Sequence, residues 1–463
     1  MLSMLQQYVR TVGNSPFGKR LVTSALWSVV GEGVSKGSML LSMMLVARIL
    51  GTSDYGGFGI IRTTTMTFAT IGGMGLGLTA NRFVAKFRDR QQQECGQIIG
   101  ASYTLSAAVG LLIAIAMFFG AAPLANEYLH EPRLEAGFKI ASALLLLHAI
   151  NGAQVGILQG FEAYRLLAFG GLLQGAMALL CVLAGAQLFG LQGALLGFLA
   201  YSAVSVVLFH ILIVRETRER RVAIRWLDIR AILPIFWGFS APVALMVIAI
   251  APFRWFSETL LARHVSFAEL GLFHAAMTMA SMLIAAASTL NAPLISLMSN
   301  LEAAGGGASR RQYVTLYGTW YAYLAMALPL LLVPQLTLLF FGSSFDKPQY
   351  FVALPTLVLY GGLLIYHQGI WRLITLQGPM WFSFGTNIVE GVTLLAAFYL
   401  LMQHGAIGLS TAFVLSYVAR IGVAVPFLLR RGIASAPLLF DRYFLASLLV
   451  LLVLCGWQIS GAA

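Results

Sequence analysis

The sequence predicts an all-α polytopic membrane protein made of two parallel six-helix bundles and an extra C-terminal helix. Three observations predict this class: an apolar composition, apolar spans of regular length, and an internal repeat. Charged residues make up 10% of the 463 residues and hydrophobic ones 59%, whereas an ordinary soluble protein has about 25% charged residues. A surface this apolar must face lipid.

Apolar spans recur along the whole chain at the length of about 20 residues that lets a helix cross a bilayer. We place thirteen of them, at 21–48, 55–79, 96–120, 138–160, 166–188, 191–214, 232–262, 268–298, 313–341, 351–374, 380–402, 405–429 and 439–460. The first span has no small-residue cleavage site after it, so we expect it to remain as a signal-anchor helix.

Basic residues gather in alternate loops. They precede span one and follow spans two, four, six, eight and twelve, most densely in 215-RETRERRVAIRWLDIR-230. The intervening loops are short or acidic, as in 126-NEYLHEPRLE-135. Because Lys and Arg favour the cytoplasmic side, we expect the N-terminus in the cytoplasm. The net charge of +12 therefore reflects topology, and we do not expect nucleic-acid binding.

An internal repeat relates the two parts of the chain. The stretch 47-ARILGTSDYGGF-58 returns as 262-ARHVSFAELGLF-273, at an offset of 215 (262 − 47). The same offset relates Gly190 to Gly405 and Phe198 to Phe413. Each copy holds six spans, an even number, so both halves enter the membrane from the same side. We therefore expect halves at 1–214 and 232–430, a cytoplasmic linker at 215–231, and an extra transmembrane helix within 431–463.

Both copies of the repeated stretch predict a tight hairpin between the first two helices of each half. Ser266 and Glu269 have the spacing of a capping box that opens a helix. Arg48 and Arg263 fall at the ends of the preceding helices, where the helix dipole favours a cation. We therefore assign these charges to the hairpins and look for substrate groups inside the spans.

Two parallel halves around a shared cavity are typical of transporters that alternate their access. The longest loop has about sixteen residues, which leaves little room for the catalytic groups of a polymerase or ligase. The loops contain no nucleotide loop, zinc spacing or nucleophile elbow. Cys95, Cys181 and Cys455 are scattered, and we expect three free thiols. We predict neither enzymatic activity nor a cofactor.

Charged residues inside the spans are the candidate functional residues, because a charge at the bilayer centre costs about 2.5–3.5 kcal/mol. They are Lys36, Arg62, Arg254 and Arg420, with the acids Glu32, Glu258 and Glu390. The excess of cations predicts an anion site, and guanidinium groups suit phosphate.

Structural alternatives remain open for each of these charges. Glu32 and Lys36 are spaced to form a pair along one helix, and Arg420 can form a salt bridge with Glu390. The side chains of Arg62, Arg254 and Glu258 are near enough to the span ends to reach the headgroups. We expect the polar residues His148, His274, His367 and Asn291 to form hydrogen bonds between helices.

The chain resembles the Wzx-type polysaccharide flippases, which export O-antigen and exopolysaccharide units. The resemblance rests on R-x-L-G at 48–51, D-Y-G-x-F at 54–58, GLGLTANRFVA at 75–85, and Gly-x-x-Gly at 190–193. These flippases share a superfamily with the MATE drug exporters and the lipid II flippases.

This resemblance implies a V-shaped pair of bundles around a cationic cavity, in the bacterial inner membrane. It implies that undecaprenyl-pyrophosphate-linked oligosaccharides pass from the cytoplasmic to the periplasmic leaflet, in concert with polysaccharide polymerase machinery. Lys36, Arg62, Arg254 and Arg420 would then hold the head group. The acids Glu32, Glu258 and Glu390 would couple transport to H⁺ or Na⁺ or line the cavity. The usual span count is twelve or fourteen, whereas thirteen would place the C-terminus in the periplasm.

Three other functions remain open. A MATE-like ion-coupled small-molecule exporter shares the architecture, but a site for cationic drugs should be acidic. A major-facilitator porter would show Gly-x-x-x-Asp-Arg-x-Gly-Arg-Arg after span two, where this chain reads 81-NRFVAKFRDRQQQECG-96. A membrane-embedded glycosyl polymerase is disfavoured by the short loops.

Overall fold

A computed structural model of the chain describes residues 16–73, 75–89, 91–226, 248–290, 308–377 and 380–462. Within these ranges the chain forms helices and no strands. The all-α class predicted from the sequence is confirmed.

The N-terminal bundle contains two helices that turn back on themselves. It consists of α2 (Pro16–Gly73), α3 (Leu76–Phe87), α4 (Gln92–Ala122), α5 (Glu135–Gly160) and α6 (Tyr164–Glu219). Helix α2 breaks at Gly51, whose φ of 72° lies in the left-handed region that favours glycine. Helix α6 breaks at Phe189 and Gly190. Each of the two helices therefore supplies two spans.

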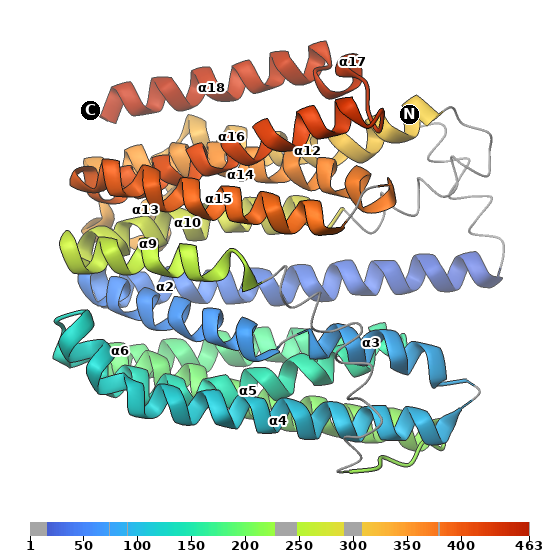
Figure 1. Cartoon of the computed structure of the whole chain (residues 1–463). Coiled ribbons are helices and arrows are strands. Elements are labelled where there is room, and N and C mark those ends of the chain that lie inside the picture. Colours follow the sequence, from blue (N-terminus) through green and yellow to red (C-terminus); the bar gives the residue numbers. More distant parts are fainter. Residues whose placement is uncertain are drawn as a thin grey trace.

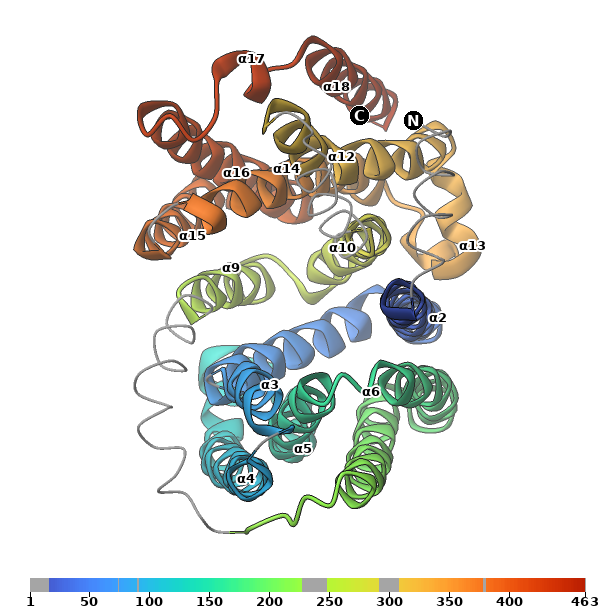
Figure 2. The same ribbon diagram turned by 90° about the vertical axis from the view of Figure 1, so that its right-hand side faces the viewer.

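The C-terminal bundle repeats this plan and adds one helix. It consists of α9 (Ala251–His264), α10 (Phe267–Ser288), α12 (Ala308–Leu332), α13 (Leu338–Phe341), α14 (Pro348–Gln377), α15 (Met380–Leu401), α16 (Gly405–Arg430), α17 (Ala436–Leu439) and α18 (Arg442–Ala462). The extra helix α18 packs on α12 and α14 at the outer face of this bundle. The two bundles meet where α2 packs against α9 and α10 (Figures 1 and 2).

The backbone carries the repeat that the sequence predicts. Gly190 has φ 58° and Gly405 has φ 55°, and 405 − 190 is 215. Both glycines open the last helical span of their half. Few residues adopt a positive φ, so its occurrence at two positions separated by the repeat offset shows that the two halves bend at equivalent points. The prediction of two parallel bundles is confirmed.

The membrane spans agree with the sequence prediction. Nine helical segments in the described ranges are long and apolar enough to cross a membrane. Three of them, Gly33–Thr70, Tyr164–Glu219 and Trp381–Arg430, each cover two predicted spans, so the nine cover twelve. The remaining predicted span, 232–262, is described only from residue 248 onward.

The predicted end of the second span is wrong. The second span was expected to run to residue 79, but α2 ends at Gly73 and α3 begins at Leu76. Gly75, directly before α3, has φ 69°, a left-handed value that favours glycine and that separates α3 from α2.

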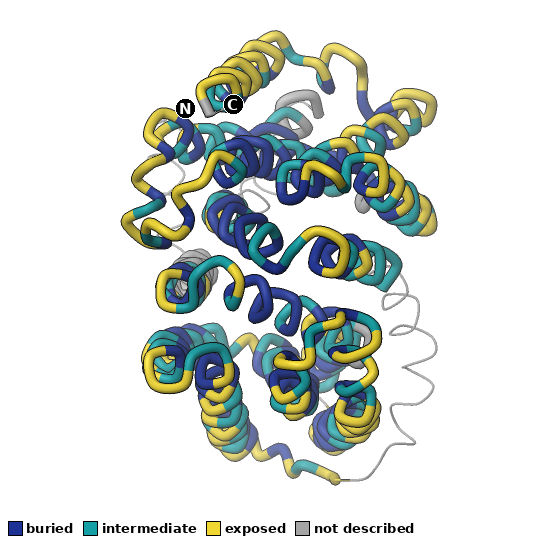
Figure 3. Tube along the Cα trace, turned by 90° about the vertical axis from the view of Figure 1, so that its left-hand side faces the viewer, coloured by how far each residue is buried: buried dark blue, intermediate teal, exposed yellow. Residues whose placement is uncertain are grey.

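Large apolar side chains cover the outside of the molecule, as a lipid-facing surface requires. Leu112 is 68% exposed, Phe119 75% and Leu400 79%. Buried positions face the interior of each bundle and the zone where the bundles meet (Figure 3). Contiguous exposed apolar surface of this extent is rare on soluble proteins. The chain is a multi-pass membrane protein.

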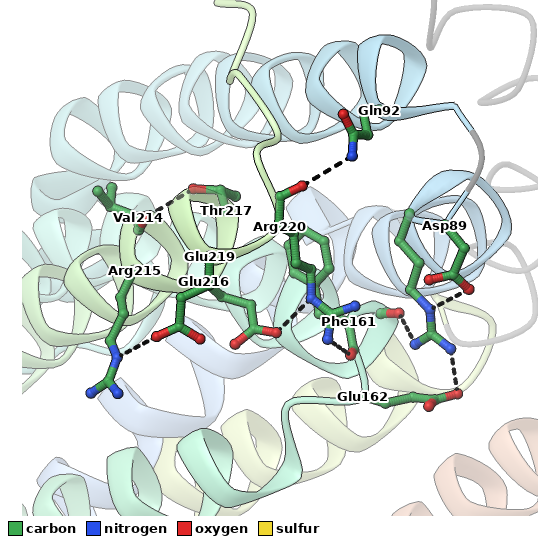
Figure 4. A network of polar contacts seen from close by, with 12 residues as sticks. Asp89, Gln92, Phe161, Glu162, Val214, Arg215, Glu216, Thr217, Glu219 and Arg220 are labelled. Carbon is green, nitrogen blue, oxygen red and sulfur yellow. Dashed lines mark hydrogen bonds and ion pairs between the residues drawn. The ribbon is translucent and has the colours of Figure 1, made fainter.

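The two ends of the molecule hold different connections between helices. At one end, which we call the basic end, lie the α3–α4 and α5–α6 connections and the end of α6 (Figure 1). Here Arg88 contacts Glu162, and Arg220 contacts Glu216 and the Phe161 carbonyl (Figure 4). At the other end, which we call the hairpin end, lie the breaks at Gly51 and Gly190 and the α9–α10 turn.

Candidate functional site

A cavity of about 340 Å³ lies between the bundles. It is lined by α2, α6 and α10 through Ser35, Lys36, Met39, Leu40, Gln174, Gly175, Ala178, Tyr201, Ser281 and Ala285. Among these lining residues Lys36 is the one charged side chain. The cavity has the size of small-molecule sites in other proteins, which range over about 300–1,000 Å³.

The polar groups that line this cavity are few and chemically different from one another. Lys36 contributes an ammonium group, Gln174 an amide, Tyr201 a phenol and Ser281 a hydroxyl. Close packing of α6 on α2 shapes the wall, because a Cβ at Gly175 would lie 3.0 Å from the Ser38 Cβ. An ammonium beside amide and hydroxyl groups suits a ligand that joins an anion to a polyhydroxyl group.

A second cluster of charges lies within the C-terminal bundle. Arg254 of α9 donates through Nη2 to Glu390 Oε1 of α15 over 2.8 Å. Arg420 of α16 donates through Nη1 to Glu390 Oε2. The Glu390 side chain is only 1% exposed, so two guanidinium groups surround one buried carboxylate. The ion pair between Arg420 and Glu390, which the sequence offered as the structural alternative, is present.

Aromatic rings complete the surroundings of both arginines. The Arg254 guanidinium carbon lies 5.7 Å from the centroid of the Phe413 ring, and that of Arg420 lies 5.7 Å from the Tyr417 ring. Such cation–π contacts favour the charged state of a poorly hydrated guanidinium. The cluster therefore retains one positive charge in excess, held between three helices.

A third cluster lies where α2 meets α9 and α10. Glu258 Oε2 of α9 is 3.5 Å from His274 Nε2 of α10. Both residues are buried, and neither of these two atoms has a hydrogen-bond partner. The charge of Arg62 on α2 acts on both side chains. It also acts on Tyr201, which lines the cavity. The cluster and the cavity are therefore neighbours in the zone where the bundles meet.

The family model described as "Polysaccharide biosynthesis protein" matches residues 21–300, which is more than half of the chain. The chain belongs to the polysaccharide biosynthesis protein family. A comparison with curated protein sequences finds no match.

Solved structures share the fold of this family member. The lipid II flippase MurJ in an inward closed conformation has a TM-score of 0.69 at 12% identity, over 94% of this chain and 98% of that one. A multidrug resistance MATE transporter in an inward-facing conformation has a TM-score of 0.64 at 15% identity, over 88% and 98%. A MOP superfamily transporter from Pyrococcus furiosus, described as having a binding pocket of reverse polarity, has 0.62 at 17% identity, over 90% and 96%.

The structure of this family member distributes the predicted site residues over three places. Lys36 lines the cavity. Arg254, Arg420 and Glu390 form the cluster in the C-terminal bundle, and Arg62 and Glu258 belong to the cluster between the bundles. The side chain of Glu32 and the whole of Asn291 lie outside the described residues. The four predicted cations therefore do not line one common cavity wall.

Sequence reasoning missed the uncharged residues of the cavity. Gln174 carried a signal, because an amide in an apolar span needs a polar partner or water. Tyr201 and Ser281 carried none, because their positions become significant only when α6 and α10 face α2. For His274 we expected a hydrogen bond between helices. The structure places it beside a buried carboxylate instead.

Proposed function

We propose that this protein moves lipid-linked oligosaccharide units, carried on undecaprenyl pyrophosphate, from one leaflet to the other by alternating access. The observation that carries this proposal is the cavity between the bundles, where the ammonium group of Lys36 adjoins an amide and hydroxyl groups. Membership of the polysaccharide biosynthesis family supports a sugar-containing cargo. The lipid II flippase shares the fold, although at 12% identity.

In this mechanism the cavity takes the head group and the lipid tail stays in the bilayer. Lys36 contacts the pyrophosphate, while Gln174, Tyr201 and Ser281 contact sugar hydroxyls. The bundles then rock relative to each other, and the cavity opens to the other side. We place the protein in the bacterial inner membrane with the basic end in the cytoplasm, and its cargo would pass to polysaccharide polymerase machinery.

The two buried acids are the proposed points of ion coupling. Protonation of Glu390 would release Arg254 and Arg420 for an anionic group of the cargo. Protonation between Glu258 and His274 would provide the hydrogen bond that both atoms lack. Either event changes the charge of a buried acid, so H⁺ suits both sites better than a larger cation.

A flipping assay tests the cavity. The protein is reconstituted into vesicles with a fluorescent undecaprenyl-pyrophosphate oligosaccharide, and the fraction accessible to a membrane-impermeant quencher is followed in time. Lys36→Ala should slow flipping by about tenfold or more, because a charge-assisted hydrogen bond contributes about 1.5–3 kcal/mol. Lys36→Arg should retain most of the rate.

Lys139→Ala is the matched control, because Lys139 forms a surface pair with Glu135 away from the cavity. It should leave flipping unchanged. Equal rates for the wild type and Lys36→Ala would contradict the cavity assignment. Transport of a cationic dye without any flipping would favour a MATE-like exporter instead.

A further inference from the structure

Helices α2 and α10 cross at two glycines that the repeat makes equivalent. A Cβ built on Gly56 would overlap the carbonyl oxygen of Phe267, and one built on Gly271 would overlap the carbonyl oxygen of Thr52. The pairs correspond, because 56 + 215 is 271 and 52 + 215 is 267. Each half therefore presents the same glycine to the same carbonyl of the other half.

This crossing joins the two bundles and not two helices of one bundle. Helix α2 belongs to the N-terminal half and α10 to the C-terminal half. In lipid, glycines allow two helix backbones to approach without a side chain between them. The reciprocal contact therefore brings the backbones of the two halves together at positions that the repeat makes equivalent.

Further contacts between the halves lie on the same side of the cavity. The Gly59 backbone abuts the His274 ring, and Tyr55 Oη lies 3.2 Å from Thr278 Oγ1. Nearer the hairpin end, Arg48 Nη1 donates to the Leu339 carbonyl over 3.1 Å. We call these contacts, with the two glycines, the hairpin-end seam.

The seam lies between the cavity and the hairpin end. Along α10, Gly271 precedes the lining residue Ser281 by ten residues, about 15 Å of helix. Along α2, Gly56 follows the Gly51 break by five residues. A head group in the cavity must therefore pass this seam to leave at the hairpin end.

We infer that the reciprocal crossing of Gly56 and Gly271 is the gate that closes the hairpin end, and that the absence of side chains at both positions sets how completely it closes. The inference rests on the proposed alternating access. It adds the position of the gate and its mechanism of closure. A methyl group at either glycine has no room in the closed state and ample room when the halves separate. Alanine at either position should consequently favour the state that is open at the hairpin end.

Spin-label distances between the halves test the gate without any substrate. Ile49 and His264 are exposed and equivalent in the repeat (49 + 215 = 264), so labels there report the separation of the halves. The native cysteines are first replaced, and the protein is measured in lipid nanodiscs. Gly56→Ala and Gly271→Ala should each raise the ratio of long to short distances by about tenfold, as expected for an overpacked contact.

The reciprocity gives a sharper expectation. Gly56 and Gly271 lie at the same crossing, so the separation of the helices that one alanine causes also makes room for the other. The double variant should therefore shift the distances little further than either single variant. Gly120→Ala is the matched control, because a Cβ at Gly120 of α4 meets nothing within 4 Å. It should leave the distribution as in the wild type.

A second label pair separates gating from damage to the fold. Ile49 and Glu127 both lie in the N-terminal bundle and are exposed, so their distance should stay constant in all variants. An unchanged distance between the halves in both alanine variants would overturn the inference, and so would an equal change within the N-terminal bundle. If the wild type flips no lipid-linked oligosaccharide in the vesicle assay while the alanine variants still shift the distances, the proposed cargo is refuted and the gate stands.

Discussion

Glu390 accepts a hydrogen bond from Arg254 over 2.8 Å and a second one from Arg420, and thereby joins α15 to α9 and α16. The carboxylate is almost fully buried, and an unpaired charge there would be energetically costly. Its two arginine partners neutralise that charge. The three helices belong to one bundle, and the cluster therefore holds that bundle together while leaving one guanidinium charge in excess.

Glu390→Gln should lower stability strongly. The substitution removes the carboxylate and leaves two guanidinium groups without an anion, and breaking such a buried pair costs about 3 kcal/mol or more. Thermal unfolding in detergent measures the effect. Glu219→Gln, which removes the exposed partner of Arg215, should change stability by about 0.5 kcal/mol or less. Equal effects of the two variants would contradict a structural role for the cluster.

Glu258→Gln should abolish the response of flipping to an imposed proton gradient. Glutamine keeps the size of the side chain but cannot take up a proton. The Glu258 side chain faces His274, and Arg62 and Arg254 act on it from α2 and α9. Flipping is measured in vesicles with and without a pH difference across the membrane. A response that persists in Glu258→Gln and disappears in Glu390→Gln would move the coupling site to the cluster of Glu390, Arg254 and Arg420.

Gly190→Ala and Gly405→Ala should destabilise the protein unequally, although the two positions are equivalent in the repeat. Both combine a positive φ with ψ near −130° (Gly190 −136°, Gly405 −128°), a backbone conformation that costs a non-glycine residue about 1–3 kcal/mol. A Cβ at Gly190 meets nothing within 4 Å, but one at Gly405 lies 2.5 Å from Glu269 Oε2. That oxygen accepts the Ala406 N–H over 2.8 Å. Unfolding temperatures should therefore fall further for Gly405→Ala, and the reverse order would contradict this packing.

Arg88→Ala should loosen the basic end of the N-terminal bundle locally. Arg88 donates to the Gly160 carbonyl over 2.9 Å and pairs with Glu162 over 2.9 Å, so it ties the α3–α4 connection to the α5–α6 connection (Figure 4). Hydrogen exchange should quicken at residues 160–164 and not in the core of α5. Arg88→Lys should restore the protection only partly, because an ammonium group lacks the planar fork of a guanidinium. Faster exchange throughout α5 would show a global effect instead.

The sequence predicted the features that depend on periodicity and on the repeat. Apolar spans gave the helices, and the constant offset gave the parallel halves and the equivalence of Gly190 with Gly405. The pairing of Arg420 with Glu390 was foreseen as an alternative because both charges are deep in their spans. The partners that depend on how helices face each other were not foreseen. To predict that Glu258 lies beside His274, or that Lys36 and Tyr201 line one cavity, one must know how each helix is rotated about its axis. Near-uniform apolar spans do not encode that rotation.

The C-terminal helix α18 has a practical consequence. It ends at the hairpin end, whereas α2 begins at the basic end (Figure 1), so epitopes attached near the two ends of the described chain face different compartments. Molecules can insert into reconstituted vesicles in two orientations. A protease added outside would remove the epitope near α2 from molecules in one orientation and the epitope near α18 from molecules in the other. The share of each orientation can thus be counted in the preparation used for a flipping assay, and unidirectional transport can be assigned to one face of the protein.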